Sequence, residues 1–93
     1  MGVVSLGPGL IALSPEGAAA SAYDLLYLAF VNTVVTGDER SAREVVELVR
    51  IIEGWRCSTN PDERRAYKIF MRSYGRYYRK VRKWLAQSGL GNA

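Results

Sequence analysis

Hydrophobic residues recur at helical spacing in three segments of the chain, and residues typical of helix ends bound each segment. The first segment, residues 15–35, is apolar on nearly every side. The second, residues 42–53, carries one apolar stripe, and the third, residues 61–87, carries a longer one. We therefore predict an all-α protein, a three-helix hairpin or bundle, with residues 15–93 forming one helical domain.

Capping residues mark the expected ends of the first two helices. Ser14 precedes a proline and suits the N-cap of the first helix, and Gly37 suits its C-terminal stop. Ser41 and Glu44 have the spacing of a capping box at the start of the second helix. Gly54 is expected to end the second helix.

The third helix is the longest of the three. Asn60 suits its N-cap and Gly89 its stop, while Gly75 inside it suggests a bend or a close backbone contact. The connector from Gly54 to Asn60 exceeds the usual turn of a helix-turn-helix motif. Residues 1–14 contain short β-permissive apolar runs, and we expect an extended apolar N-terminal arm there, as a short hairpin or laid on a partner.

Charge is distributed unevenly along the chain. Residues 1–39 contain no Lys or Arg, whereas residues 64–93 contain nine basic residues and no acid. On a helical wheel the third helix has a core side and, opposite to it, a cationic side. The predicted nucleic-acid-binding residues of this cationic side are Arg65, Lys68, Arg72, Arg76, Arg79, Lys80 and Lys83. They span about 27 Å at 1.5 Å per residue, a length that suits a run of phosphates.

A nucleic acid is the partner that this cationic side favours, ahead of an ordinary solvated surface, an acidic lipid or an acidic protein. Arginine outnumbers lysine there, which favours forked contacts with phosphates. No Asn or Gln stands among these cations to read adenine. We therefore predict sequence-independent binding to double-stranded DNA, with RNA left open. The tyrosines of this helix are predicted to be core residues in the main; Tyr78, at the border of the two sides, is the best candidate among them for a contact, and single-strand binding through stacked aromatics is the weaker alternative.

The first helix has more apolar surface than two neighbouring helices can cover. A surplus of this kind is typical of an oligomer interface. The predicted interface residues are Tyr23, Leu26, Tyr27, Phe30 and Val34. Residues 17–35 also approach the length of a membrane span, but Asp24 inside them is costly in a bilayer. We therefore expect a homo-oligomer rather than a membrane partner.

The sequence contains no catalytic or metal-binding pattern. It has no histidine and one cysteine, Cys57, which excludes an internal disulfide and leaves too few ligands for a zinc site. Gly-rich phosphate loops and the HExxH and GxSxG elements are also missing. We therefore predict that the protein is not an enzyme and has no catalytic residues, metal or cofactor. Cys57 is expected to pack near a turn.

The apolar helix with LLYLAFVNTVV and the basic helix with YGRYYRKVRKW resemble the small α-helical DNA-coating virion proteins of rod-shaped or filamentous archaeal viruses. The resemblance is one of architecture and covers about two-thirds of the chain. It implies a structural protein that self-assembles and coats or packages duplex DNA, in a virion or as a cytoplasmic nucleoid protein. The Arg-, Val- and Gly-rich composition suits a thermophile.

Two other interpretations fit the same pattern. One is a dimeric helix-turn-helix transcription regulator, in which the third helix would read an operator. The other is a single-span or peripheral membrane protein with a basic cytoplasmic helix, because the basic residues follow the apolar segment.

Overall fold

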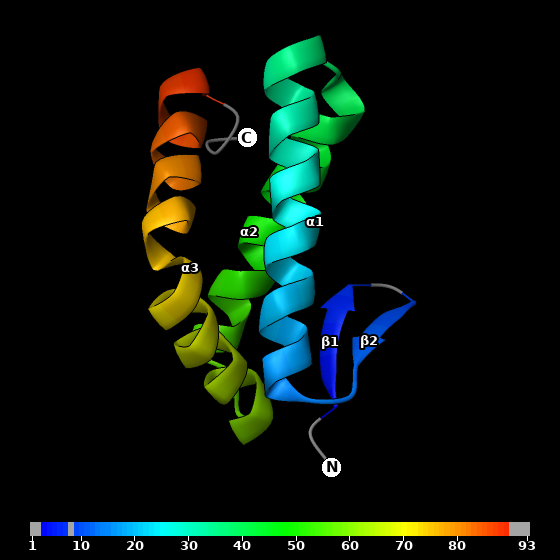
Figure 1. Ribbon diagram of the computed structural model, residues 1–93, viewed down its shortest axis with the longest axis vertical. Coiled ribbons are helices and arrows are strands. Elements are labelled where there is room, and N and C mark those ends of the chain that lie inside the picture. The colour runs from blue at the N-terminus through cyan, green and yellow to red at the C-terminus, as the bar shows by residue number, and fades with distance from the viewer. Residues whose placement is uncertain (1–2, 8, 90–93) are drawn as a thin grey trace.

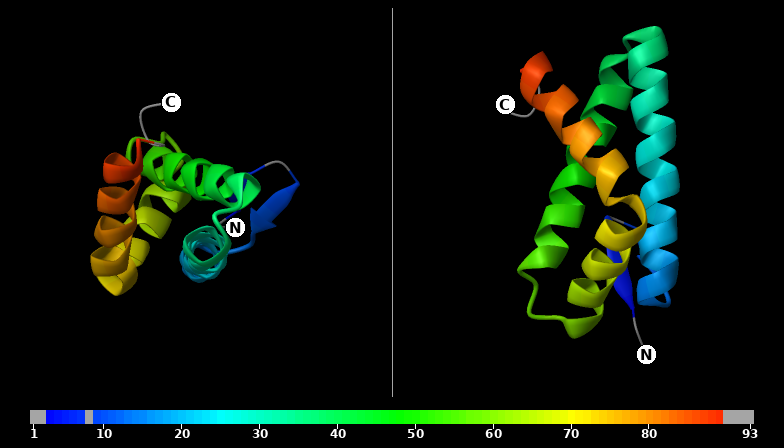
Figure 2. Two further views of the ribbon diagram at one scale, coloured as in Figure 1. Left: turned by 90° about the horizontal axis from the view of Figure 1, so that it is seen from above. Right: turned by 60° about the vertical axis from the view of Figure 1, so that its left-hand side comes forward.

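Three helices and a short two-stranded hairpin make up the fold in the computed structural model, which describes residues 3–7 and 9–89 (Figure 1). The elements are β1 (Val4–Gly7), β2 (Leu10–Ala12), α1 (Pro15–Thr36), α2 (Glu39–Arg56) and α3 (Pro61–Ser88). The helices run up, down and up, and each of them packs against the other two (Figures 1 and 2). The prediction of an all-α three-helix bundle with an N-terminal arm is confirmed.

The limits of α1 agree with the capping signals. The side chain of Ser14 accepts a hydrogen bond from the amide of Gly17 at 2.9 Å, and Pro15 opens the helix. At the other end, Gly37 adopts a left-handed φ of 69°, and its amide donates to the Thr33 carbonyl at 2.8 Å. The helix therefore begins and ends within one residue of the prediction.

The start of α2 differs from the predicted capping box. Asp38 is the N-cap, and its carboxylate accepts from the amide of Arg40 at 3.3 Å. The Ser41 hydroxyl lies inside the helix, where it donates to Asp38 at 3.1 Å and accepts from the Asn32 side chain. The carboxylate of Glu44 pairs with Arg40 instead, with Glu44 Oε1 4.0 Å from Arg40 Nε. The carboxylate of Asp38 outcompetes the serine because it meets the positive end of the helix dipole with a charge.

The end of α2 also differs, because the helix continues through Gly54 to Arg56. Trp55 explains the extension. Its side chain is 2% exposed, and its Nε1 donates to the Ser5 carbonyl of the hairpin at 3.2 Å. Burying an indole outweighs the cost of about 1 kcal/mol for a helical glycine. The connector to α3, residues 57–60, is therefore shorter than predicted and has the length of a helix-turn-helix turn.

The third helix begins and ends as predicted. The Asn60 side chain accepts from the Asp62 amide at 2.9 Å, and Gly89 closes the helix with a φ of 79°. The axis of α3 bends near its middle, where Gly75 lies (Figure 1). A Cβ atom on Gly75 would meet only side chains at ordinary distance, so the predicted close backbone contact is absent there.

The N-terminal arm is a β-hairpin that lies on its own helical bundle. Strands β1 and β2 are antiparallel, with Val4 opposite Ala12 and a bulge between Ser5 and Gly7. Val4, Leu6 and Ala12 point into the core, and the hairpin lies beside the N-terminal half of α1 (Figure 1). The predicted arm also includes residues 1, 2 and 8, which lie outside the described residues.

The core combines small residues of α1 with larger ones of the other helices. The buried side chains are Ala18, Ala19, Ala22, Leu26 and Ala29 of α1, Val45, Leu48, Ile52 and Trp55 of α2, and Ala66, Phe70, Tyr78, Val81 and Leu85 of α3. The alanines let α1 approach its neighbours closely. Between α1 and α3, Tyr23 stacks on Tyr74 with ring centroids 4.2 Å apart.

Candidate nucleic-acid interface

The solvent side of α3 carries all seven predicted nucleic-acid-binding residues, and each of them is exposed. We call this surface the basic face; its residues are Arg65, Lys68, Arg72, Arg76, Arg79, Lys80 and Lys83. The opposite side of the same helix buries Phe70, Tyr78 and Val81 in the core. Packing of that apolar side therefore fixes the direction in which the cations point.

The cations of the basic face are almost all without an acidic partner. Arg65 alone is paired, with its Nη2 3.4 Å from a carboxylate oxygen of Glu16 on α1. The other six make no ion pair within residues 3–7 and 9–89. Exposed pairs such as Arg65–Glu16 contribute little energy, so Arg65 can exchange its partner for another anion. The cations of the basic face are therefore available to bind an external anionic partner.

Within the described part of the chain, the acidic residues near α3 lie in its first turn or on neighbouring helices, Glu16 of α1 beside Arg65 among them. Asp62 and Glu63 occupy its first turn, and the Glu63 carboxylate accepts from the Ser58 hydroxyl at 2.6 Å. Glu53 of α2 is held by Arg82, with Nη1 and Oε2 3.1 Å apart. From Lys68 to Lys83 the sequence of α3 contains cations and no acid, so positive charge predominates on its exposed side.

A polar hollow of about 400 Å³ lies between the C-terminal part of α2 and α3. Its α3 residues stand on both sides of the bend, which turns the C-terminal half of the helix back across α2 (Figure 2). The lining residues are Glu53, Arg56, Tyr67, Met71, Tyr78, Arg79, Arg82 and Lys83. We call this site the α2–α3 hollow. Sequence reasoning suggested a bend at Gly75 but missed the hollow, because the approach of α2 to this part of α3 depends on the tertiary fold.

Tyr78 corrects one of the sequence-based expectations. It is 1% exposed, and its ring meets Phe70 edge-on with centroids 5.5 Å apart. Its hydroxyl donates to Glu53 Oε2 at 2.5 Å. Burial, followed by the hydrogen bond and the charge of Glu53, raises the pKa of Tyr78 well above its ordinary value. Tyr78 therefore belongs to the core and does not stack on a base. Of the two tyrosines that line the hollow, the half-buried Tyr67 is the more accessible one.

The predicted oligomer interface is only partly at the surface. Leu26 is 0% exposed in the core, so its assignment to an interface is wrong. Tyr23 and Phe30 are half-buried in an aromatic cluster with α3, in which Phe30 meets Trp84 edge-on. The apolar face that α1 presents to solvent consists of Tyr27, Leu28, Val31, Val34 and Val35. Because α1 is apolar all round, its sequence could not show which side the other helices cover.

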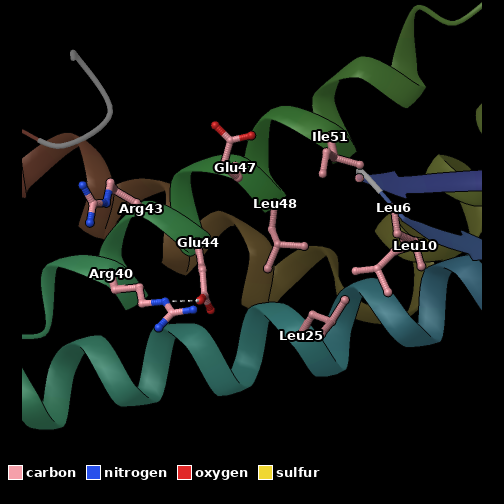
Figure 3. Close-up of a pocket in the computed structure, with 10 residues that line it drawn as sticks. Leu6, Leu10, Leu25, Arg40, Arg43, Glu44, Glu47, Leu48 and Ile51 are labelled. Carbon is pink, nitrogen blue, oxygen red and sulfur yellow. Dashed lines mark ion pairs between the residues drawn. The ribbon is translucent and has the colours of Figure 1, made fainter.

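A second concavity, an apolar groove of about 380 Å³, lies between the hairpin, α1 and α2. Figure 3 shows Leu6, Leu10, Leu25, Leu48 and Ile51 toward its floor. The charged residues at its rim are Arg40, Arg43, Glu44 and Glu47. Because the rim carries both signs equally, the groove has no preference for an anion.

Three further features bear on the membrane alternative, on Cys57 and on metal binding. Within the described part of the chain, α1 is the one helix long and apolar enough to cross a bilayer, and a third of its most apolar window is buried by the rest of the protein. Cys57 lies exposed in the connector rather than packed. No group of three His, Cys, Asp or Glu in residues 3–7 and 9–89 could hold a metal ion.

Comparison with known proteins finds no relative of this chain. No protein-family model matches it, and no curated protein and no solved structure matches it.

Proposed function

We propose that the protein is a non-catalytic structural protein that coats or packages duplex DNA through the basic face of α3. The observation that carries the proposal is the run of six cations from Lys68 to Lys83 on one helix, which have no acidic partner among the residues that the structure describes. It covers about 22 Å at 1.5 Å per residue. Cations fixed at this spacing can neutralise several phosphates and release their counterions.

Sequence-independent binding follows from the chemistry of the basic face. Lys and Arg side chains supply phosphate contacts, and no Asn or Gln stands among them to read a base. The residues at the start of α3 are acidic, Asp62 and Glu63, which disfavours insertion of that end into a groove. A coat or nucleoid protein needs only the phosphate contacts and no contacts with bases. A virion is the location that the resemblance to archaeal virus proteins favours.

Self-association is the second half of the proposal, with a second copy of the chain on the apolar face of α1. Leu28 and Val35 are 66% and 76% exposed, and they adjoin Tyr27, Val31 and Val34 on one side of the helix. Soluble monomers rarely expose such contiguous apolar surface. The same face on two copies can pair symmetrically, which suits a homo-oligomer built along DNA.

Duplex binding across a salt series tests the proposal, with light scattering on the same samples. Tight binding to random-sequence DNA is expected, with affinity falling steeply as salt rises. The double variant Arg72→Gln/Arg76→Gln should reduce the slope of log affinity against log salt by about 1.8, at about 0.9 per lost phosphate contact. The matched control is Arg40→Gln/Arg43→Gln, which removes two exposed arginines of α2 outside the basic face.

Three results would contradict the proposal: no duplex binding at low salt, an equal loss in the control variant, or binding without growth of the particles. A regulator remains the second candidate, because the connector of residues 57–60 has the length of a helix-turn-helix turn. One dimer on one operator, with weak binding elsewhere, would favour it. Binding to anionic vesicles without DNA would favour the peripheral membrane alternative.

A further inference from the structure

We propose that the α2–α3 hollow binds a nucleoside phosphate, either as a free nucleotide or as one nucleotide of a single strand. This ligand class goes beyond duplex coating, because the hollow is a concave site between two helices rather than a convex face. Its volume of about 400 Å³ lies within the usual range of small-ligand pockets.

The charge of the hollow selects an anion. Arg56, Arg79, Arg82 and Lys83 line it together with a single carboxylate, that of Glu53. Glu53 Oε2 is already engaged by the Tyr78 hydroxyl at 2.5 Å and by Arg82 Nη1 at 3.1 Å. The acid is therefore neutralised within the wall. An excess of positive charge remains for the ligand, and arginine can hold a phosphate through two parallel hydrogen bonds.

The other wall of the hollow selects a flat, partly apolar group. Tyr67 and Met71 line it from the turns of α3 before the bend, and both side chains are half-buried. An aromatic ring in such a position can stack on a nucleobase, and a thioether packs against ring edges. A nucleotide can therefore contact both walls, with its base against Tyr67 and Met71 and its phosphate against the arginines.

Hydrogen bonds within the protein hold one wall of the hollow in place. Tyr78 is 1% exposed and holds Glu53, which in turn holds Arg82. Two helices supply the cations, since Arg56 belongs to the last turn of α2. A site assembled from two packed elements loses little freedom when its ligand binds.

Methyl NMR of Met71 tests the proposal. The chain has two methionines, Met1 and Met71, so methionine-methyl labelling gives a simple spectrum with one probe in the hollow. AMP and a short single strand of deoxyadenosine are the two phosphate-bearing probes, and adenosine is the control without phosphate. A saturable shift of the Met71 methyl signal is expected with AMP, with the strand or with both, and a far weaker one with adenosine. A response to AMP identifies a free nucleotide as a ligand, and a response to the strand alone identifies a nucleotide within a chain.

The variant Arg56→Gln supplies the decisive comparison, because Arg56 is exposed and lies outside the basic face. We expect it to weaken the response at least fivefold, while Arg43→Gln, an exposed arginine of α2 outside the hollow, leaves it unchanged. No shift with either probe, an equal shift with adenosine, or an unchanged affinity in Arg56→Gln would overturn the proposal.

Failure of this inference can be told from failure of the proposed function. Arg72→Gln/Arg76→Gln lies outside the hollow, so it should weaken duplex binding and leave the AMP response intact. If duplex DNA binds through α3 and Met71 never responds, only the hollow is misassigned. If Met71 responds and duplex DNA does not bind, the coating function is wrong and the nucleotide site stands.

Discussion

The Tyr78 hydroxyl donates a 2.5 Å hydrogen bond to the carboxylate of Glu53, which lies 25 residues earlier in the chain. The bond joins α3 to α2 at the place where α3 crosses back over α2. Arg82 contacts the same carboxylate oxygen at 3.1 Å. The contacts of Tyr78 and Arg82 with Glu53 thus join the two helices where they cross, and they also hold the wall of the α2–α3 hollow in place.

Removing the Tyr78 hydroxyl should destabilise the fold. In Tyr78→Phe the ring can still pack against Phe70, but Glu53 loses a donor in a partly buried position. A hydrogen bond to a charged group contributes about 1.5–3 kcal/mol, and we expect a loss of this size in the free energy of unfolding. Urea denaturation monitored by circular dichroism measures it.

The neighbouring residue provides the matched control. The Tyr77 hydroxyl is buried and has no hydrogen-bond partner among the described residues. Tyr77→Phe should therefore be neutral or stabilise the protein by up to about 1 kcal/mol, because a buried polar group without a partner carries a desolvation cost. Equal destabilisation by the two substitutions would contradict the assigned role of the Tyr78–Glu53 bond.

Alkaline pH should destabilise the protein through the same tyrosines. Burial, and then the nearby Tyr23 and Tyr27, raises the pKa of Tyr77 from 10.0 to about 12, and burial raises the pKa of Tyr78 as well. Between pH 10 and 12 the folded chain retains a proton at Tyr77 that the unfolded chain releases. The free energy of unfolding should therefore be constant below pH 10 and fall as the pH rises toward 12.

Denaturation curves at pH 8 to 12 measure this effect, and absorbance at 295 nm follows tyrosinate formation directly. The variant Tyr77→Phe should show a shallower fall in stability over this window. A fall as steep as that of the unmodified chain would exclude Tyr77 as a source of the pH dependence.

Substitution of two leucines of α1 should distinguish the residues that stabilise the fold from those that mediate self-association. Leu26 is 0% exposed, so Leu26→Ala should cost about 2–5 kcal/mol of stability. Leu28 is 66% exposed, so Leu28→Ala should change stability by less than about 0.5 kcal/mol. Leu28→Ala should nevertheless lower the molecular mass measured by light scattering, since it removes apolar area from the face assigned to a second copy. An unchanged mass at every concentration would remove Leu28 from the contact.

Gly75 should tolerate alanine. An added Cβ would lie 3.5 Å from the Met71 Cε and 3.7 Å from an Arg79 nitrogen, which are ordinary contacts with flexible side chains. Gly75→Ala should therefore stabilise α3 by up to about 1 kcal/mol in thermal unfolding. Gly89→Ala is the contrasting variant, because φ is 79° there and a side chain is strained in that conformation. A loss of stability in Gly75→Ala would show that the bend of α3 depends on the glycine.

The helices could be predicted from the sequence because their ends carry local signals. Ser14, Gly37, Asn60 and Gly89 act through backbone groups within four residues, so their roles can be read without the rest of the fold. The direction of the basic face follows from the same local geometry. The helix ends and the direction of the basic face could therefore both be predicted from local features of the sequence.

The remaining features depend on contacts between distant segments. Trp55 extends α2 because the hairpin provides the Ser5 carbonyl as an acceptor, and the hydroxyl of Tyr78 is bound by Glu53 of another helix. No local signal in α1 distinguishes Leu26 from Leu28, because both are leucines in an evenly apolar helix. The α2–α3 hollow was missed for the same reason: Arg56 and Tyr67 meet only through the tertiary fold.

The hydrogen bond from Trp55 to Ser5 spans 50 residues, whereas the helices follow one another through connectors of only a few residues. Short-range contacts form early in folding, and a contact that closes a long loop forms late. We therefore expect the pairs α1–α2 and α2–α3 to form first, and the contacts that close long loops, Trp55 with Ser5 and Tyr23 with Tyr74, to form last. The hairpin should also be the first part to open in the native state, which would uncover the indole of Trp55 while the helices stay together.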